Sequence, residues 1–191
     1  AQLFCGGEGS GGLALAVAYA QYLNCENPGD QDSCGACNSC NKYQKLIHPD
    51  LHFSYPAIGA QILSTAFIED WRAAFFENPY LNALQWVQRI GTENKQANIT
   101  AAETHEIIRK LSLKMFEGPF KVLIMWLPEY LGKDGNVLLK LIEEPTDDTI
   151  LLFVTENRDR ILSTIQSRTQ IVQLGILSEE EITEGLITRY Q

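Results

Sequence analysis

The chain has 191 residues, which suits one domain of ordinary size, and a hydrophobic content of 45% excludes an intrinsically disordered chain. With 24 acidic residues against 15 basic ones, the formal net charge is −9, which argues against a free-standing nucleic-acid-binding domain because phosphate contacts need a basic face. No apolar run approaches the roughly 18 residues of a membrane-spanning helix, so no membrane partner is expected. The chain starts without Met and ends inside a helical pattern, as a piece of a longer protein would.

The first half of the chain predicts one strand, several helices and two irregular segments. Residues 1–5 form a short apolar strand that runs into a glycine-rich turn, and the alanine-rich residues 13–23 favour a helix. Residues 24–41, rich in Cys, Gly, Asn and Asp, read as a loop, and residues 48–60 as an extended segment. Residues 67–90 have helical spacing with a break near Asn78 and Pro79.

The second half predicts three buried strands between helices. Thr100 and Glu103 form a capping box that starts a helix to about residue 116, with Met115 on its buried face. A second box, Ser178 to Glu181, opens a helix to the chain end, and residues 136–142 form a short one. The apolar runs 121–127, 150–155 and 170–174 are typical of parallel strands buried on both faces. The alternation predicts a three-layer α/β fold with a parallel sheet.

The glycine-rich turn has the frame of a phosphate-binding P-loop without its chemistry. Gly6 and Gly11 occupy the glycine positions of G-x-x-x-x-G-K-[ST], but Gly12 replaces the lysine and Leu13 the magnesium-binding hydroxyl. Glu8 adds a negative charge that disfavours a triphosphate, although backbone N–H groups could still meet an anion. Alternatively, the segment is a glycine-rich turn that never bound a nucleotide.

A later strand has lost a second pair of chemical positions. In working ATPases of this frame an apolar strand ends in Asp-Glu, which serve magnesium and the attacking water. Here Trp126 and Leu127 stand at those positions, and Glu129, beyond Pro128, is not expected to reach the same spot. Four losses on an intact frame predict that the chain neither binds ATP productively nor hydrolyses it.

Four cysteines lie within sixteen residues with the spacing C-x8-C-x2-C-x2-C. Two-residue spacing lets neighbouring thiolates bind one tetrahedral ion, so Cys25, Cys34, Cys37 and Cys40 predict a structural zinc site. An iron–sulfur cluster and free or redox-active thiols are the alternatives. The remaining cysteine, Cys5, is expected to be an inert core thiol, and the residues His48, His52 and His105 lack ligand spacing and are expected to be structural.

Two polar motifs lie near the predicted domain surface. Arg168 follows a short helical turn and precedes a strand, where it could project toward a neighbouring subunit as an arginine finger. A surface ion pair is the simpler alternative. The turn Glu143-Glu144-Pro145 ends a helix and could pair with basic groups of a neighbour or be a solvated helix end.

In their order along the chain, four motifs resemble the AAA+ module of bacterial DNA polymerase III clamp-loader subunits. They are LFCGGEGSGG at 3–12, the cysteine insert, NVLLKLIEEP at 136–145 and IQSR at 165–168. The resemblance covers nearly the whole chain, and the losses at the P-loop make it similar to the delta-prime type rather than to gamma/tau. The family's Ser-Arg-Cys motif reads Ser-Arg-Thr over residues 167–169.

The resemblance implies an AAA+ domain over residues 1–176 with a zinc insert at 25–40, and the start of a truncated helical lid at 177–191. It implies a cytoplasmic, ATP-inactive member of a five-membered ring with gamma/tau and delta subunits. That subunit would supply Arg168 to a neighbour's ATP site and help to load the sliding clamp on primed DNA. A weak ATPase of the gamma/tau type and a free-standing zinc-dependent binding module are the alternatives. Residues 61–100 match the family least and receive no role.

Overall fold

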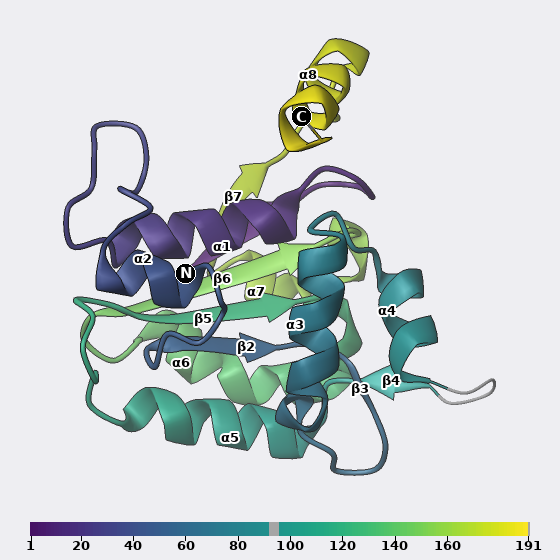
Figure 1. Cartoon of the computed structure of the whole chain (residues 1–191). Helices are drawn as coiled ribbons and strands as arrows, with labels where there is room; N and C mark the ends of the chain where they lie inside the picture. The colour runs from purple at the N-terminus through teal and green to yellow at the C-terminus, as the bar shows by residue number, and fades with distance from the viewer. Residues whose placement is uncertain (92–95, 191) are drawn as a thin grey trace.

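The structure, a computed structural model, describes residues 1–91 and 96–190 and is built around one parallel sheet. Its five strands lie in the order β2-β5-β6-β1-β7, and all neighbours are parallel (Figure 1). The strands are β1 (Gln2–Cys5), β2 (Leu51–Ser54), β5 (Lys121–Trp126), β6 (Thr149–Thr155) and β7 (Gln170–Gln173). The predicted α/β class with a parallel sheet is confirmed.

Helices cover both faces of the sheet, because alternate strand residues point to opposite sides. Val122 and Ile124 of β5 belong to one buried cluster, and Leu123 and Met125 to the other. The first cluster includes residues of α1 (Gly12–Leu23), α2 (Asn38–Tyr43), α3 (Ile68–Glu77) and α4 (Ala83–Ile90). The second includes residues of α5 (Ala101–Ser112), α6 (Leu139–Glu143) and α7 (Ser163–Gln166). The result is the predicted three-layer domain.

Smaller elements complete the fold. A two-stranded antiparallel sheet pairs β3 (Ala57–Ile58) with β4 (Ala97–Asn98). Short 3₁₀ turns are η1 (Ser64–Phe67), η2 (Pro128–Tyr130), η3 (Gly132–Leu138) and η4 (Arg158–Arg160). The last helix, α8 (Glu179–Tyr190), points away from the sheet beyond β7 (Figure 1), and residue 191 of the predicted lid segment lies outside the described residues. Among the helices described, none has the length and hydropathy to cross a membrane.

The helix that starts at Thr100 ends earlier than the sequence predicts. It stops at Ser112, since Lys121 Nζ donates to the carbonyls of Leu111 and Leu113. Asp50 then accepts hydrogen bonds from the backbone N–H groups of residues 116–118. A lysine and a carboxylate from distant segments therefore replace the expected last turn, and Met115 lies exposed instead of on a buried face.

Of the two capping boxes predicted from the sequence, one is complete in the structure and the other is only half formed. At Ser178 both hydrogen bonds with Glu181 form. At Thr100 only half of the box exists, because the Glu103 carboxylate accepts from Ser64 N and Oγ at 2.8 and 2.6 Å instead of turning back to its own helix. Glu103 is 4% exposed. Its carboxylate accepts the hydrogen bonds of the buried Ser64 and is therefore not available to cap its own helix.

Candidate functional site

The loop between β1 and α1 favours glycine through its backbone conformation and through close contacts. A Cβ on Gly6 would lie 2.3 Å from Ser10 Oγ, and Gly11 has a φ of +73° where α1 begins. Ser10 N donates to Gly7 O at 3.1 Å and closes the turn. The turn therefore favours glycine at both frame positions of the sequence motif, and also at Gly9, which has a φ of +78°.

Apolar side chains fill the space beside the lysine position. A Cβ on Gly12 would lie 3.1 Å from both Val154 Cγ1 and Leu174 Cδ1, so any side chain there forces its neighbours to move. Leu13, at the hydroxyl position, is 3% exposed and belongs to the hydrophobic core. Both chemical positions have thus become part of the packing between α1 and the sheet.

The cavity over the loop is small. Its volume is about 20 Å³, which is room for a water molecule. Tyr80, from the turn between α3 and α4, lies over Gly11, where a Cβ would be 3.1 Å from Tyr80 Cε1. Residues 61–100 carried no predicted role, yet this tyrosine forms one wall of the cavity; residues 92–95 of that segment lie outside the described residues.

The replacement of the acidic pair has created an aromatic cluster. Trp126 is 2% exposed, and its ring centroid lies 5.2 Å from that of Trp71 and 6.5 Å from that of Trp86. Leu127 is fully buried beside it and has a positive φ of 58°. An aspartate in place of Trp126 would bury an unpaired charge among aromatic rings, so this strand end is unsuited to magnesium.

Carboxylates lie close to the loop, but none occupies the position of the lost pair. Glu129 accepts a hydrogen bond from Thr155 Oγ1 at 3.1 Å, and burial raises its pKa. Burial also raises the pKa of Glu156 to about 7; the Ala83 N–H opposes this, and the negative charges of Glu129 and Glu8 add to it. Glu156 lines the cavity, so a polyphosphate would meet acidic groups there rather than a cation.

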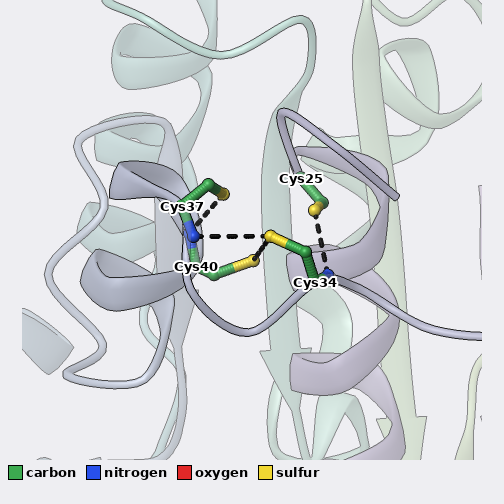
Figure 2. A group of neighbouring side chains, drawn as sticks. All are labelled: Cys25, Cys34, Cys37 and Cys40. Carbon is green, nitrogen blue, oxygen red and sulfur yellow. Dashed lines mark hydrogen bonds between the residues drawn. The ribbon is translucent and has the colours of Figure 1, made fainter. Parts of the chain in front are cut away.

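The four predicted metal ligands converge on one point (Figure 2). The sulfur atoms of Cys25, Cys34, Cys37 and Cys40 all lie within 4.8 Å of one another, and the Cys34 and Cys40 sulfurs are 4.0 Å apart. A tetrahedral site with metal–sulfur bonds of about 2.3 Å has sulfur–sulfur distances of about 3.8 Å. The cluster is therefore close to the size that one four-coordinate ion needs.

Backbone N–H groups donate hydrogen bonds to three of the four sulfurs, which favours the thiolate form of those cysteines. The N–H groups of Cys34, Cys37 and Cys40 donate to the sulfurs of Cys25, Cys34 and Cys37 at 3.2, 3.4 and 3.3 Å. Hydrogen bonds from the Ala36 and Cys37 amides lower the pKa of Cys34 to about 6, whereas burial and the neighbouring sulfurs raise the pKa of Cys40 to about 12. Four thiolates at this separation repel one another unless a cation lies between them, so the donor set fits a metal ion.

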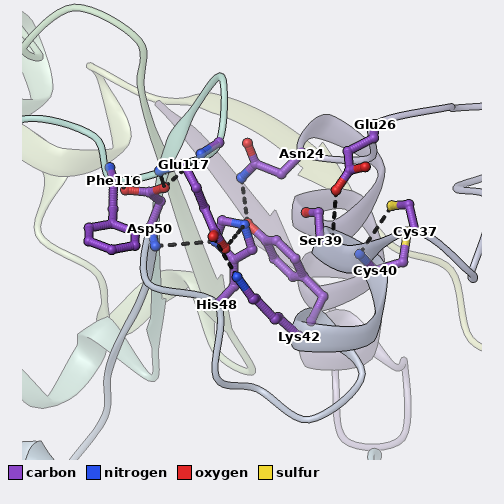
Figure 3. Close-up of polar contacts among 12 residues, drawn as sticks. Asn24, Glu26, Cys37, Ser39, Cys40, Lys42, His48, Asp50, Phe116 and Glu117 are labelled. Carbon is purple, nitrogen blue, oxygen red and sulfur yellow. Dashed lines mark hydrogen bonds and ion pairs between the residues drawn. The ribbon is translucent and has the colours of Figure 1, made fainter.

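The sequence missed the helix that carries the last ligand. Residues 38–41 were predicted as loop, but α2 begins at Asn38 because Cys37 Sγ caps the Cys40 amide. Within the insert, Glu26 accepts from Ser39 N at 3.1 Å (Figure 3). The helix α2 is held to the rest of the domain by the ion pair between Lys42 and Glu117.

The three histidines are not part of the cluster, which among the described residues contains only cysteines. His48 is buried beside Glu117, its Nδ1 accepts from Asp50 N at 3.2 Å, and burial lowers its pKa (Figure 3). Burial lowers the pKa of His52 to about 4. Cys5 lies apart in the core, 3% exposed, with a raised pKa caused by burial.

Arg168 lies at the surface after α7, where its side chain is 34% exposed. Its Nε donates to the carboxylate of Glu143, the last residue of α6. Its Nη1 donates to Thr164 O at 3.0 Å and to Ser167 Oγ at 3.3 Å. Within this chain the arginine thus forms a surface ion pair, and the glutamate turn is its partner.

The strand order, the helices on both faces and the glycine-rich loop between β1 and α1 define a P-loop domain of the AAA+ type. The model of the family described as "DNA polymerase III, delta subunit" matches residues 1–178. The chain belongs to that family.

Curated relatives carry related names. DNA polymerase III subunit delta' of Bacillus subtilis is 28% identical over 98% of this chain and 45% of that protein. The Escherichia coli subunit delta' is 25% identical over 87% of this chain and 40% of that protein. The chain thus spans less than half the length of these two relatives. The Haemophilus influenzae subunit tau/gamma is 25% identical over 97% of this chain and 22% of that protein.

A solved structure shares the fold. A DNA polymerase III gamma subunit-related protein from Thermotoga maritima superimposes with a TM-score of 0.52 at 15% identity, over 98% of this chain and 44% of that one.

Proposed function

We propose that the chain is an ATP-inactive, structural subunit of a DNA polymerase III clamp loader that offers Arg168 to the ATP site of a neighbouring subunit. The observation that carries the proposal is the packing at Gly12 and Trp126. Core side chains crowd the lysine position of the loop, and the residue at the end of β5, where a magnesium-binding carboxylate is expected, belongs to the hydrophobic core. A domain that keeps this frame but fills its site is suited to a role in assembly.

The trans role of Arg168 rests on its place and its exposure. It follows α7 and precedes the sheet strand β7, and its guanidinium is at the surface. In P-loop enzymes an arginine supplied by a neighbour contributes about 10³–10⁵ in rate. The partners implied are gamma/tau and delta subunits, with the sliding clamp and primed DNA reached through the complex.

For the cysteine cluster we propose zinc in a structural role. Four thiolates leave no open coordination position, as in structural rather than catalytic sites. Zinc contributes apparent binding free energies of roughly 10–16 kcal/mol in comparable short segments, which would order an insert with little core of its own. Cys25, Cys34, Cys37 and Cys40 would hold it.

We also propose that residues 1–176 are the AAA+ domain and that residues 177–191 begin a helical lid. The exposure of α8 and its position beyond β7 support this division. The cytoplasm, where bacterial DNA is replicated, is the compartment that the proposal implies, in keeping with the bacterial DNA polymerase subunits among its relatives.

A weak ATPase of the gamma/tau type is the second candidate. The match to a tau/gamma subunit over 97% of the chain and the fold shared with a gamma subunit-related protein favour it. It requires nucleotide to enter a cavity of about 20 Å³, which makes it the weaker candidate.

One experiment separates the candidates. The complete protein is reconstituted with gamma/tau and delta subunits, and clamp-stimulated ATPase is measured with Arg168→Ala and wild type. We expect a loss of at least tenfold for the variant and no ATP turnover by the isolated protein. Intrinsic turnover would contradict the ATP-inactive role, and an Arg168→Ala complex as active as wild type would contradict the trans role.

A further inference from the structure

The contact between Glu143 and Arg168 joins two sequence motifs that the proposed function leaves separate. Glu143 ends α6, Arg168 follows α7, and the two helices pack against each other. We propose that Glu143 is a positioning residue, whose carboxylate holds the guanidinium of Arg168 in the orientation offered to the neighbour's ATP site. This inference rests on the trans role proposed for Arg168.

The hydrogen bonds fix the guanidinium and leave one end of it available. Nε donates to Glu143, and Nη1 donates to Thr164 O and Ser167 Oγ. Because the guanidinium is planar, holding two of its nitrogens fixes the direction of the third. Among the described residues, Nη2 makes no hydrogen bond, so its two N–H groups can meet an anion from another subunit.

The ion pair between Glu143 and Arg168 is suited to fixing the orientation of the guanidinium rather than to stabilising the fold. The side chains of Arg168 and Glu143 are 34% and 48% exposed, and exposed pairs of this kind contribute little to folding. An unrestrained arginine loses rotamer entropy when it reaches a phosphate. A group fixed beforehand acts mainly on the transition state, so it raises kcat more than it lowers KM.

The test uses the complete protein in complex with gamma/tau and delta subunits, and measures the kcat and KM of clamp- and DNA-stimulated ATPase. We expect Glu143→Ala to lower kcat about tenfold with KM for ATP unchanged. Glu143→Gln keeps a hydrogen-bond acceptor and should fall between this variant and wild type. In an Arg168→Ala background, Glu143→Ala should have no additional effect, because the group it positions is gone.

The adjacent glutamate provides a matched control. Glu144 lies in the same turn and its side chain makes no hydrogen bond or ion pair among the described residues, so Glu144→Ala should keep the wild-type kcat. Melting temperatures of all variants should agree within about 2 °C. Wild-type or higher kcat for Glu143→Ala, or a further loss in the Arg168→Ala background, would overturn the inference. Wild-type activity of Arg168→Ala alone would instead remove the trans role, and the positioning role with it.

Discussion

At the scale of single residues, the glycine-rich loop has lost more than a lysine and a hydroxyl. Val154 and Leu174 occupy the space next to Gly12, and Trp126 fills the position of a magnesium-binding carboxylate. Restoring the two motif residues alone would therefore leave an apolar, crowded site without a metal ligand.

We expect the double substitution Gly12→Lys and Leu13→Thr to produce no ATP binding at about millimolar nucleotide with magnesium. The new lysine must displace core side chains, which typically costs about 1–3 kcal/mol, and Glu156 faces the incoming phosphates. Calorimetric titration measures the binding, and circular dichroism confirms that the variant folds. Micromolar binding by the folded variant would show that the motif residues were the sole deficit.

The pKa of Glu156 makes a second prediction, on stability. Folding raises this pKa from 4.5 to about 7, so the stabilisation by its protonated form is fully present below about pH 4.5 and is lost as the pH rises through about 7. Glu156→Gln, which can still accept from the Ala83 amide, should match wild type near pH 4.5. It should melt roughly 2–6 °C higher near pH 8, from about 1–2 kcal/mol after allowance for solvent screening.

Thermal melts at a series of pH values provide the measurement, with the exposed Glu144→Gln as the control that should show no such trend. A difference between Glu156→Gln and wild type that stays constant with pH would mean that the carboxyl titrates normally.

The departures from the P-loop pattern could be found in the sequence because a P-loop has fixed spacing, so each differing residue is visible at a known position. Tyr80 and Glu156 could not, since they come from segments without a motif and meet the loop only in the folded chain. The pairing of Arg168 with Glu143 was likewise hidden, although both motifs were recognised, because 25 residues separate the partners.

At the scale of elements, local hydrogen bonds organise the cysteine insert, and its four sulfurs lie close enough together to hold one metal ion. The short helix α2 escaped prediction because its cap is a cysteine sulfur, which ordinary helix signals do not include. The true end of α5 was hidden for a related reason, since Asp50 and Lys121 come from elsewhere in the chain.

Removal of the metal should affect this element first. We expect protein purified without chelator to hold about one zinc per chain, and its removal to abolish amide protection in residues 25–43 before β5 and β6 are affected. Hydrogen exchange followed by mass spectrometry resolves the two regions. Cys40→Ser should lose the ion, whereas the control Cys5→Ala, which changes a cysteine outside the cluster, should retain it. Unchanged protection after metal removal would argue that packing alone orders the insert.

At the scale of the whole molecule, the strands were predictable and their spatial order was not. Continuous apolar runs mark β5 and β6, which are buried on both faces, but the same prediction is wrong for β7, an edge strand of exposed and half-buried residues. Hydropathy also does not specify which strands are neighbours. Asn24 illustrates the contacts that complete the domain: its side chain exchanges hydrogen bonds of 3.0 Å with the backbone of Phe120 and donates to Tyr43 Oη. These hydrogen bonds connect the end of α1 and the helix α2 to the residue that precedes β5.

The aromatic cluster has an optical consequence. The chain contains three tryptophans, and all of them, Trp71, Trp86 and Trp126, lie buried within one cluster on the side of the sheet that carries α1. Intrinsic tryptophan emission is therefore a reporter of that single face. The opposite layer, which includes α6 with Glu143 and α7 beside Arg168, contains no tryptophan. An introduced fluorophore would be needed to follow changes there.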